Sequence, residues 1–157
     1  MNLPKRREHV TELKAGDIIR MNTIGKNLSI IYRQFTVFLN RELADSELTA
    51  TELMYIGSLY DQDGVTQDDL AREFCIDKAA TARTIQTLES KGILLRKVDE
   101  NDRRAKRIYL TPKAEKYKTT IETVQKKWID FCGADISKEE FAAFEKILSE
   151  LAERVRR

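Results

Sequence analysis

The chain has 157 residues, of which 41% are hydrophobic and 34% are charged, a balance typical of one folded, water-soluble domain. No apolar run approaches the ~20 residues of a membrane-spanning helix, and the first ten residues contain no apolar signal-peptide core, so we expect a cytoplasmic protein. The single histidine, His9, lies in a basic terminal segment without a partner set for catalysis or metal binding. We therefore expect no enzyme activity, no cofactor and no metal site.

The two cysteines, Cys75 and Cys132, are too few for a disulfide framework and lack the spacing of metal ligands. Each has apolar neighbours in the sequence, which predicts a buried small side chain. An oxidant-sensing thiol is the alternative.

Charge is distributed unevenly along the chain. Residues 45–77 hold 9 acidic residues and 1 basic residue, whereas residues 78–118 hold 12 basic and 5 acidic residues. A net charge of +7 gathered in one block indicates a polyanionic partner. A solvated basic face without a partner is the alternative.

The first predicted element is a long helix. Residues 1–14 are basic and irregular, which indicates a frayed end or an arm that contacts a phosphate backbone. From residue 17 to 39, apolar residues follow one another in steps of three and four, a pattern that predicts one amphipathic helix. The stripe consists of Ile18, Met21, Ile24, Leu28, Ile31, Phe35 and Phe38.

Three short helices are predicted next. The pair Thr49 and Glu52 has the spacing of a capping box and predicts a helix over residues 50–60. The pair Thr66 and Asp69 predicts a second helix over 67–74, and Asp77 caps a third over 78–90. Two short helices joined by about three residues form a helix-turn-helix pattern.

A hairpin and two helices complete the chain. Residues 93–98 and 105–110 predict two antiparallel strands around a charged tip. A helix begins at Pro112, a position that tolerates proline, and ends at Gly133; Ser137 then caps a last helix with an apolar stripe. The predicted fold class is mostly α (α+β): a winged helix-turn-helix with long N- and C-terminal helices.

Such a fold binds DNA by placing the 78–90 helix in the major groove. The cationic hairpin reaches the narrow minor groove, where the negative potential is enhanced. We expect Arg83 to bind guanine and Gln86 adenine, and Asp102 to orient the guanidinium of Arg104. The other expected contacts are the small residues Ala79 and Ala82, which let the helix approach the groove, and the phosphate-binding residues Lys78, Thr87, Arg103, Lys106 and Arg107.

The sequence resembles the MarR family of bacterial transcription regulators. The resemblance rests on "LT…E" before the 50–60 helix, "TQDDLA", "IDKAATAR", "LESKGILLR" and "NDRRAKRIYLT", and extends over nearly the whole chain. It implies a homodimer that binds a pseudo-palindromic operator, with an arm and dimerisation helix at 1–44, the DNA-binding domain at 45–112 and dimerisation helices at 113–157. The expected dimer interface contains Ile18, Met21, Phe141, Phe144, Leu148 and Leu151.

The resemblance also implies a repressor that releases DNA when a small ligand, often a phenolic anion, binds. The candidate pocket residues are the aromatic Tyr32, Phe35, Tyr55 and Trp128, although packing in the core is an alternative for each. Two other functions remain open: a thiol-based redox sensor, and a winged helix used only for protein contacts. The family's oxidant sensors are expected to carry their cysteine in the first helix, where this chain has none.

Overall fold

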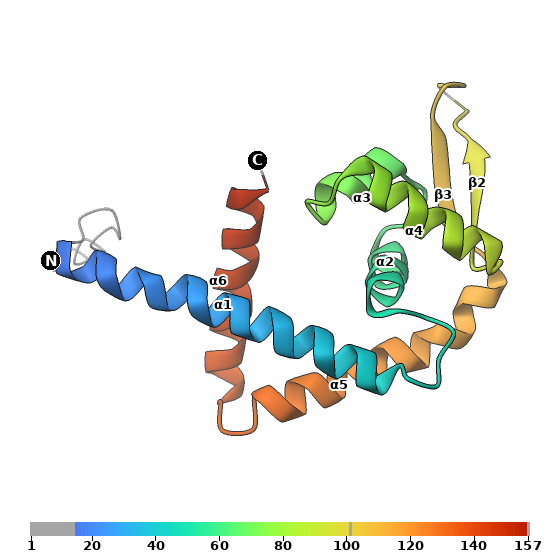
Figure 1. Cartoon of the computed structure of the whole chain (residues 1–157). Coiled ribbons are helices and arrows are strands. Elements are labelled where there is room, and N and C mark those ends of the chain that lie inside the picture. The colour runs from blue at the N-terminus through green and yellow to red at the C-terminus, as the bar shows by residue number, and fades with distance from the viewer. Residues whose placement is uncertain (1–14, 101, 157) are drawn as a thin grey trace, which may run out of the picture. The chain divides into compact units, whose positions relative to one another are not determined.

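The computed structural model describes residues 15–100 and 102–156, with side chains from residue 23 onward (Figure 1). The chain divides between Phe38 and Leu39 into two units. The described part is mostly helical, with one three-stranded sheet. The elements are α1 (Ala15–Glu42), α2 (Ala50–Asp61), β1 (Val65–Thr66), α3 (Gln67–Glu73), α4 (Lys78–Ser90), β2 (Leu94–Val98), β3 (Lys106–Leu110), the 3-10 helix η2 (Pro112–Tyr117), α5 (Lys118–Cys132) and α6 (Lys138–Val155).

The caps predicted from the sequence begin the helices where we expected. Thr49 with Glu52 and Thr66 with Asp69 form complete capping boxes, in which each side chain binds the other residue's backbone N–H. Asp77 accepts hydrogen bonds from the backbone N–H groups of Ala79 and Ala80. These caps confirm the starts of α2, α3 and α4.

The sheet holds one strand more than the sequence predicted. Its order is β1–β3–β2, and both pairings are antiparallel. Strands β2 and β3 form the predicted hairpin beside α4 (Figure 1), with Leu94 opposite Leu110 and Val98 opposite Lys106. The hairpin and its connecting residues, 94–110, are called the wing below.

The core of the second unit lies where α2, α3 and α4 meet the sheet. It contains the fully buried side chains of Tyr55, Ile56, Leu59, Leu70, Thr81, Ile85, Leu88, Ile93 and Ile108. The Tyr55 ring stacks on Phe74 with 4.7 Å between ring centroids, and its hydroxyl lies 3.0 Å from the Thr81 hydroxyl. This bond links α2 to the helix that follows the turn.

Two expectations from the sequence were wrong. Cys75 and Cys132 are both exposed, because Cys75 forms the turn between α3 and α4 with a positive φ of 51° and Cys132 ends α5. We expected an α-helix to begin at Pro112, but residues 112–117 form a 3-10 helix and α5 begins only at Lys118.

The long helices α1 and α6 have exposed apolar side chains. Within α6, no residue is buried, although its side chains include Phe144, Ile147, Leu148, Leu151 and Val155. Within α1, Ile24, Leu28, Ile31, Tyr32 and Val37 are exposed. No helix among the described residues is long and apolar enough to cross a membrane.

Candidate nucleic-acid interface

The α4 helix has a buried face and an exposed face. Thr81, Ile85 and Leu88 are buried, and their steps of four and three residues place them on one face of the helix. The opposite face exposes Lys78, Ala79, Arg83, Gln86 and Thr87, with Ala82 half-buried among them. This face presents cationic and amide groups around small side chains, so the helix backbone can approach a surface closely.

The N-terminal end of α4 is fixed by contacts with α3. The turn between the helices closes through a 3.0 Å hydrogen bond from Ile76 N to Ala71 O. Lys78 Nζ lies 2.6 Å from Asp68 Oδ2, and both side chains are largely exposed. An exposed ion pair of this kind contributes little to stability, so the Lys78 ammonium can exchange this carboxylate for another anion at small cost.

The C-terminal end of α4 is fixed by Lys91. Its ammonium donates to the Glu52 carboxylate at 2.7 Å and to the backbone carbonyl of Glu47. The Glu47 carboxylate in turn accepts from Lys116 and Tyr117, and these hydrogen bonds lower its pKa to about 2. The α4 helix is thus held at both ends while its exposed face stays open.

The tip of the wing is closed by its own backbone and by one aspartate. Asp99 N donates to Ala105 O at 3.0 Å, and Ala105 N donates to Asp102 O at 2.9 Å. The Asp102 carboxylate accepts from the backbone N–H of Arg104 at 2.9 Å, whereas the sequence suggested a bond to the Arg104 guanidinium. The carboxylate therefore shapes the turn that displays the arginine.

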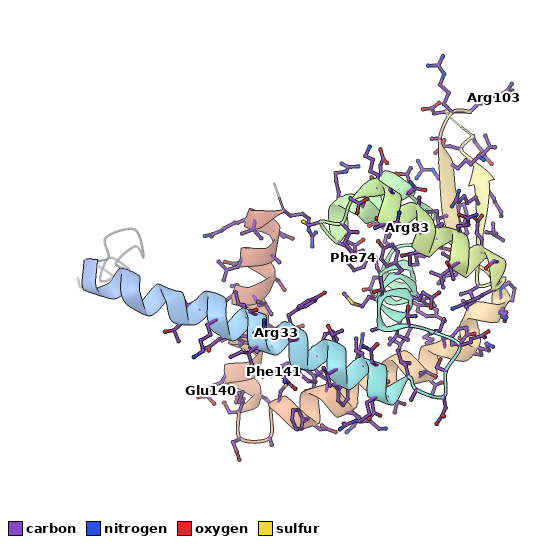
Figure 2. The ribbon with its side chains drawn as sticks, in the orientation of Figure 1. Arg33, Phe74, Arg83, Arg103, Glu140 and Phe141 are labelled. Carbon is purple, nitrogen blue, oxygen red and sulfur yellow. The ribbon has the colours of Figure 1, made fainter. Side chains whose placement is uncertain are left out.

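The wing exposes cations near α4. Arg103, Arg104 and Lys106 are exposed; Figure 2 shows Arg103 at the tip and Arg83 on α4. A cleft between the start of α3 and the wing is lined by Thr66, Gln67, Asp68, Arg96, Arg104, Ala105, Lys106 and Ile108. With three cations against one carboxylate, this cleft favours an anionic group.

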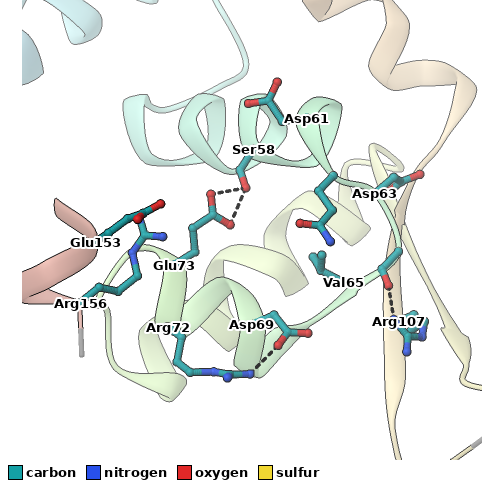
Figure 3. A pocket seen from close by; sticks show the side chains of 12 residues that line it. Ser58, Asp61, Asp63, Val65, Asp69, Arg72, Glu73, Arg107, Glu153 and Arg156 are labelled. Atoms are coloured by element: carbon teal, nitrogen blue, oxygen red, sulfur yellow. Dashed lines mark hydrogen bonds and ion pairs between the residues drawn. The ribbon is translucent and has the colours of Figure 1, made fainter. Parts of the chain in front are cut away.

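A second, wider pocket has the opposite character (Figure 3). It is lined by Ser58, Asp61, Gln62, Asp63, Gly64, Val65, Asp69, Arg72, Glu73, Arg107, Glu153 and Arg156. Ser58 donates to Glu73 at 2.7 Å, and hydrogen bonds from Thr66 lower the pKa of Asp69. Because its carboxylates outnumber its cations, the pocket disfavours a polyanion.

The predicted ligand residues lie in different environments. Tyr55 belongs to the core, with 1% of its surface exposed. Tyr32 is exposed and Phe35 half-buried on α1, whereas Trp128 is half-buried on α5, 5.9 Å from the Phe131 ring. Among the described residues, no group of three or more metal-binding side chains comes together.

The predicted interface residues on α6 are available for contact. Phe144, Leu148 and Leu151 are exposed, and Phe141 is half-buried, with 6.5 Å between the rings of Phe141 and Phe144. The side chains of Ile18 and Met21 lie outside the described residues.

The region that carries this surface matches a known family. A model described as the MarR family matches residues 48–106, from the loop before α2 to the first residue of β3. The uncharacterized HTH-type transcriptional regulator YybA of Bacillus subtilis strain 168 is 30% identical over 96 residues, which cover 61% of this chain and 64% of YybA. The matched segment, from the loop before α2 into the wing, is similar in sequence to the MarR family.

Solved structures resemble the chain over most of its length. A MarR transcriptional regulator from Methanosarcina mazei Go1 is 27% identical, with a TM-score of 0.78 over 85% of this chain and 99% of the other. A putative MarR family transcriptional regulator from Listeria monocytogenes, solved in complex with 26mer DNA, is 20% identical with a TM-score of 0.77 over 83% of this chain and 87% of the other. These matches confirm the predicted winged-helix fold.

Sequence reasoning missed the residues that support the wing. Asp63 accepts from Leu110 N at 3.0 Å, Gly64 N donates to Ile108 O at 2.9 Å, and Asp99 binds Arg107. In the sequence, an Asp-Gly pair such as Asp63–Gly64 indicates only a turn, and Asp99 is one of several charged residues at the tip. Their partners are too distant along the chain for a local pattern to indicate.

Proposed function

We propose that this protein is a sequence-specific DNA-binding transcription regulator of the MarR family. The observation that carries the proposal is the open face of α4, flanked by the exposed cations of the wing and held at both ends by contacts that leave it free. The pocket of Figure 3, in contrast, is lined by more carboxylates than cations and is therefore unsuited to a polyanion. A duplex is the polyanion whose major groove accepts an α-helix of this size.

Each side chain of the surface has an assigned role in the proposed complex. Arg83 offers two donors to guanine, and Gln86 pairs with adenine in the major groove, while Ala79 and Ala82 permit the close approach. Arg104 enters the minor groove from the turn that Asp102 shapes. The proposed phosphate contacts are Lys78, Thr87, Arg103 and Lys106.

The comparisons support the proposal at the level of the fold and the family. YybA is described as an HTH-type transcriptional regulator, and the Listeria protein of the same fold binds a 26mer DNA in its crystal. The proposal extends this behaviour to the present chain.

We further propose a homodimer assembled through the terminal helices, with domain limits at 1–44, 45–112 and 113–157. The exposed apolar face of α6 supports it, because Phe144, Ile147, Leu148 and Leu151 follow the three- and four-residue steps of one helix face. A twofold dimer places two recognition helices on one side of a duplex and calls for a pseudo-palindromic site. Replacing Leu148 and Leu151 by Asp is expected to produce monomers that bind DNA weakly; a persistent dimer would place the interface elsewhere.

A repressor role and release of DNA by a small aromatic ligand complete the proposal, and they rest on the family resemblance. A ligand of this kind acts by favouring a dimer state that does not fit DNA. A screen of phenolic acids for release of bound duplex tests this part separately. Such a regulator acts in the cytoplasm.

Selection of bound sequences from random duplex DNA tests the main proposal. We expect a pseudo-palindromic site, and we expect Arg83→Ala to relax the preference at one guanine and weaken binding by about 1–3 kcal/mol. Arg72→Ala is the matched control, since Arg72 is also an exposed arginine but lines the acidic pocket. Failure of the wild-type protein to enrich any sequence would favour a winged helix used for protein contacts alone.

A further inference from the structure

One arginine of the wing has an environment unlike that of its neighbours. The guanidinium of Arg107 donates through Nε to the Asp99 carboxylate and through Nη1 to the backbone carbonyl of Gly64 at 2.8 Å. The side chain of Asp99 is only 5% exposed and that of Arg107 is 43% exposed. Arg107 thus joins two loops that both precede it in the chain, one at Asp99 and one at Gly64.

The Asp99 carboxylate connects this arginine to the wing tip. Asp99 Oδ1 accepts from Asp102 N at 3.1 Å, and the backbone N–H of Asp99 donates to Ala105 O at 3.0 Å. A buried carboxylate requires a cation or several donors, because an unpaired buried charge is strongly unfavourable. Arg107 supplies that cation, so the turn that presents Arg104 depends on it.

The other end of the connection is the loop between α2 and β1. Gly64 adopts a φ of +74°, and a side chain there would meet the Tyr109 ring, with 3.0 Å between the added Cβ and Tyr109 Cε1. Its N–H donates to Ile108 O, and its carbonyl accepts from Arg107. Both backbone polar groups of Gly64 are therefore bonded to residues of β3, which fixes the loop against the wing.

We propose that Asp99 and Arg107 form a clamp that sets the position of the wing tip relative to the helix-turn-helix. The inference rests on the proposed DNA-binding function and refines it, because it makes Arg107 a positioning residue instead of a phosphate contact. Side chains alternate between the two faces of a strand, so Arg107 and Lys106 lie on opposite faces of β3. The charge of Arg107 is also balanced locally by Asp99.

The clamp makes an unusual prediction about the sign of a charge effect. Replacing Asp99 by Asn removes a negative charge from a surface that binds a polyanion, which on electrostatic grounds alone strengthens binding. The clamp predicts the reverse: Asp99→Asn weakens duplex binding roughly tenfold because the wing tip loses its fixed position. Glu100→Gln is the matched control, since Glu100 is the adjacent, exposed carboxylate, and it is expected to leave binding unchanged or to strengthen it.

Substitutions of Arg107 separate the two roles of the arginine. If Arg107 contacts a phosphate, a lysine can replace it as a point charge, and Arg107→Lys should bind as wild type. The clamp requires one planar group to reach Asp99 and Gly64 together, so Arg107→Lys should bind about as weakly as Arg107→Ala. Lys106 provides the contrast, because it is a proposed phosphate contact on the opposite face of β3. Replacing it by Ala should weaken binding, and replacing it by Arg should weaken binding less than Ala does.

Amide hydrogen exchange gives a readout that does not need DNA. We expect the amides of Asp102 and Ala105 to exchange about tenfold faster in Asp99→Asn and Arg107→Ala than in wild type, while amides of α2 and α4 remain unchanged and show that the variants fold. Unchanged exchange at the tip, or stronger DNA binding by Asp99→Asn, overturns the clamp. If wild-type protein does not bind duplex DNA, the proposed function fails, and exchange at the tip alone decides whether the clamp exists.

Discussion

The hydroxyl pair between α2 and α4 provides a quantitative test of how the recognition helix is held. Replacing Tyr55 by Phe removes one hydroxyl and keeps the ring that stacks on Phe74. Tyr55 and Thr81 are 1% and 0% exposed, and their oxygens are 3.0 Å apart, so the remaining Thr81 hydroxyl has no access to bulk water. Leaving a buried hydroxyl unpaired costs about 1–3 kcal/mol.

The expected loss for Tyr55→Phe lies at the lower end of this range. A threonine hydroxyl inside a helix can turn to the carbonyl four residues earlier, which for Thr81 belongs to Asp77. We therefore expect a decrease of about 1–2 kcal/mol in the free energy of unfolding, which corresponds to a melting temperature lower by about 2–8 °C for a domain of this size.

A double-mutant cycle isolates the bond itself. The variants are Tyr55→Phe, Thr81→Val and the double replacement, unfolded in urea at one fixed protein concentration because assembly shifts apparent stability. Since replacing both partners by apolar groups is nearly neutral, the double variant should be more stable than the sum of the single losses predicts, by about 1 kcal/mol. Single losses below about 0.3 kcal/mol, or strict additivity, would contradict the assignment.

Three further variants test the supports of α4 and its surroundings. Asp77→Ala removes the acceptor for two backbone N–H groups and should lower the free energy of unfolding by about 1 kcal/mol in urea titrations, with Asp77→Asn as the conservative control. Ile85→Ala, at a side chain with 0% exposure, should cost about 2–5 kcal/mol in the same assay, and a loss under 1 kcal/mol would show that the site is loosely packed. The pKa of Glu47 is lowered from 4.5 to about 2 by hydrogen bonds from Lys116 and Tyr117, so its ionised form stabilises the folded state above pH 4.5, and this contribution is lost as the pH falls from 4.5 towards 2. Glu47→Gln should therefore show a shallower loss of melting temperature across that window; an identical slope would remove Glu47 from the acid response.

Local patterns predicted the helices well because each cap is satisfied by residues two or three positions away. The capping boxes at Thr49 and Thr66 and the Asp77 cap are such short-range arrangements, and α4 has the predicted bounds. The steps of four and three residues between Thr81, Ile85 and Leu88 are likewise local, and they indicate which face of α4 is buried and which is exposed.

Features that depend on distant partners could not be predicted in the same way. The strand β1 has two residues, too few for an alternating pattern, and it exists because β3 offers it a partner. The bonds of Arg107 reach Asp99 and Gly64 across 8 and 43 positions. Cys75 was misjudged because its apolar neighbours indicate burial, whereas its left-handed backbone places the thiol at the surface.

The most direct test of DNA binding through α4 and the wing is a hydroxyl-radical footprint of the wild-type protein on a duplex selected from random sequence. We predict two protected regions related by a twofold axis, about one helical turn apart, with protected minor-groove sugars flanking them where the wings reach. A duplex that stays uniformly cleaved at low salt, or a single protected patch without symmetry, would contradict the account.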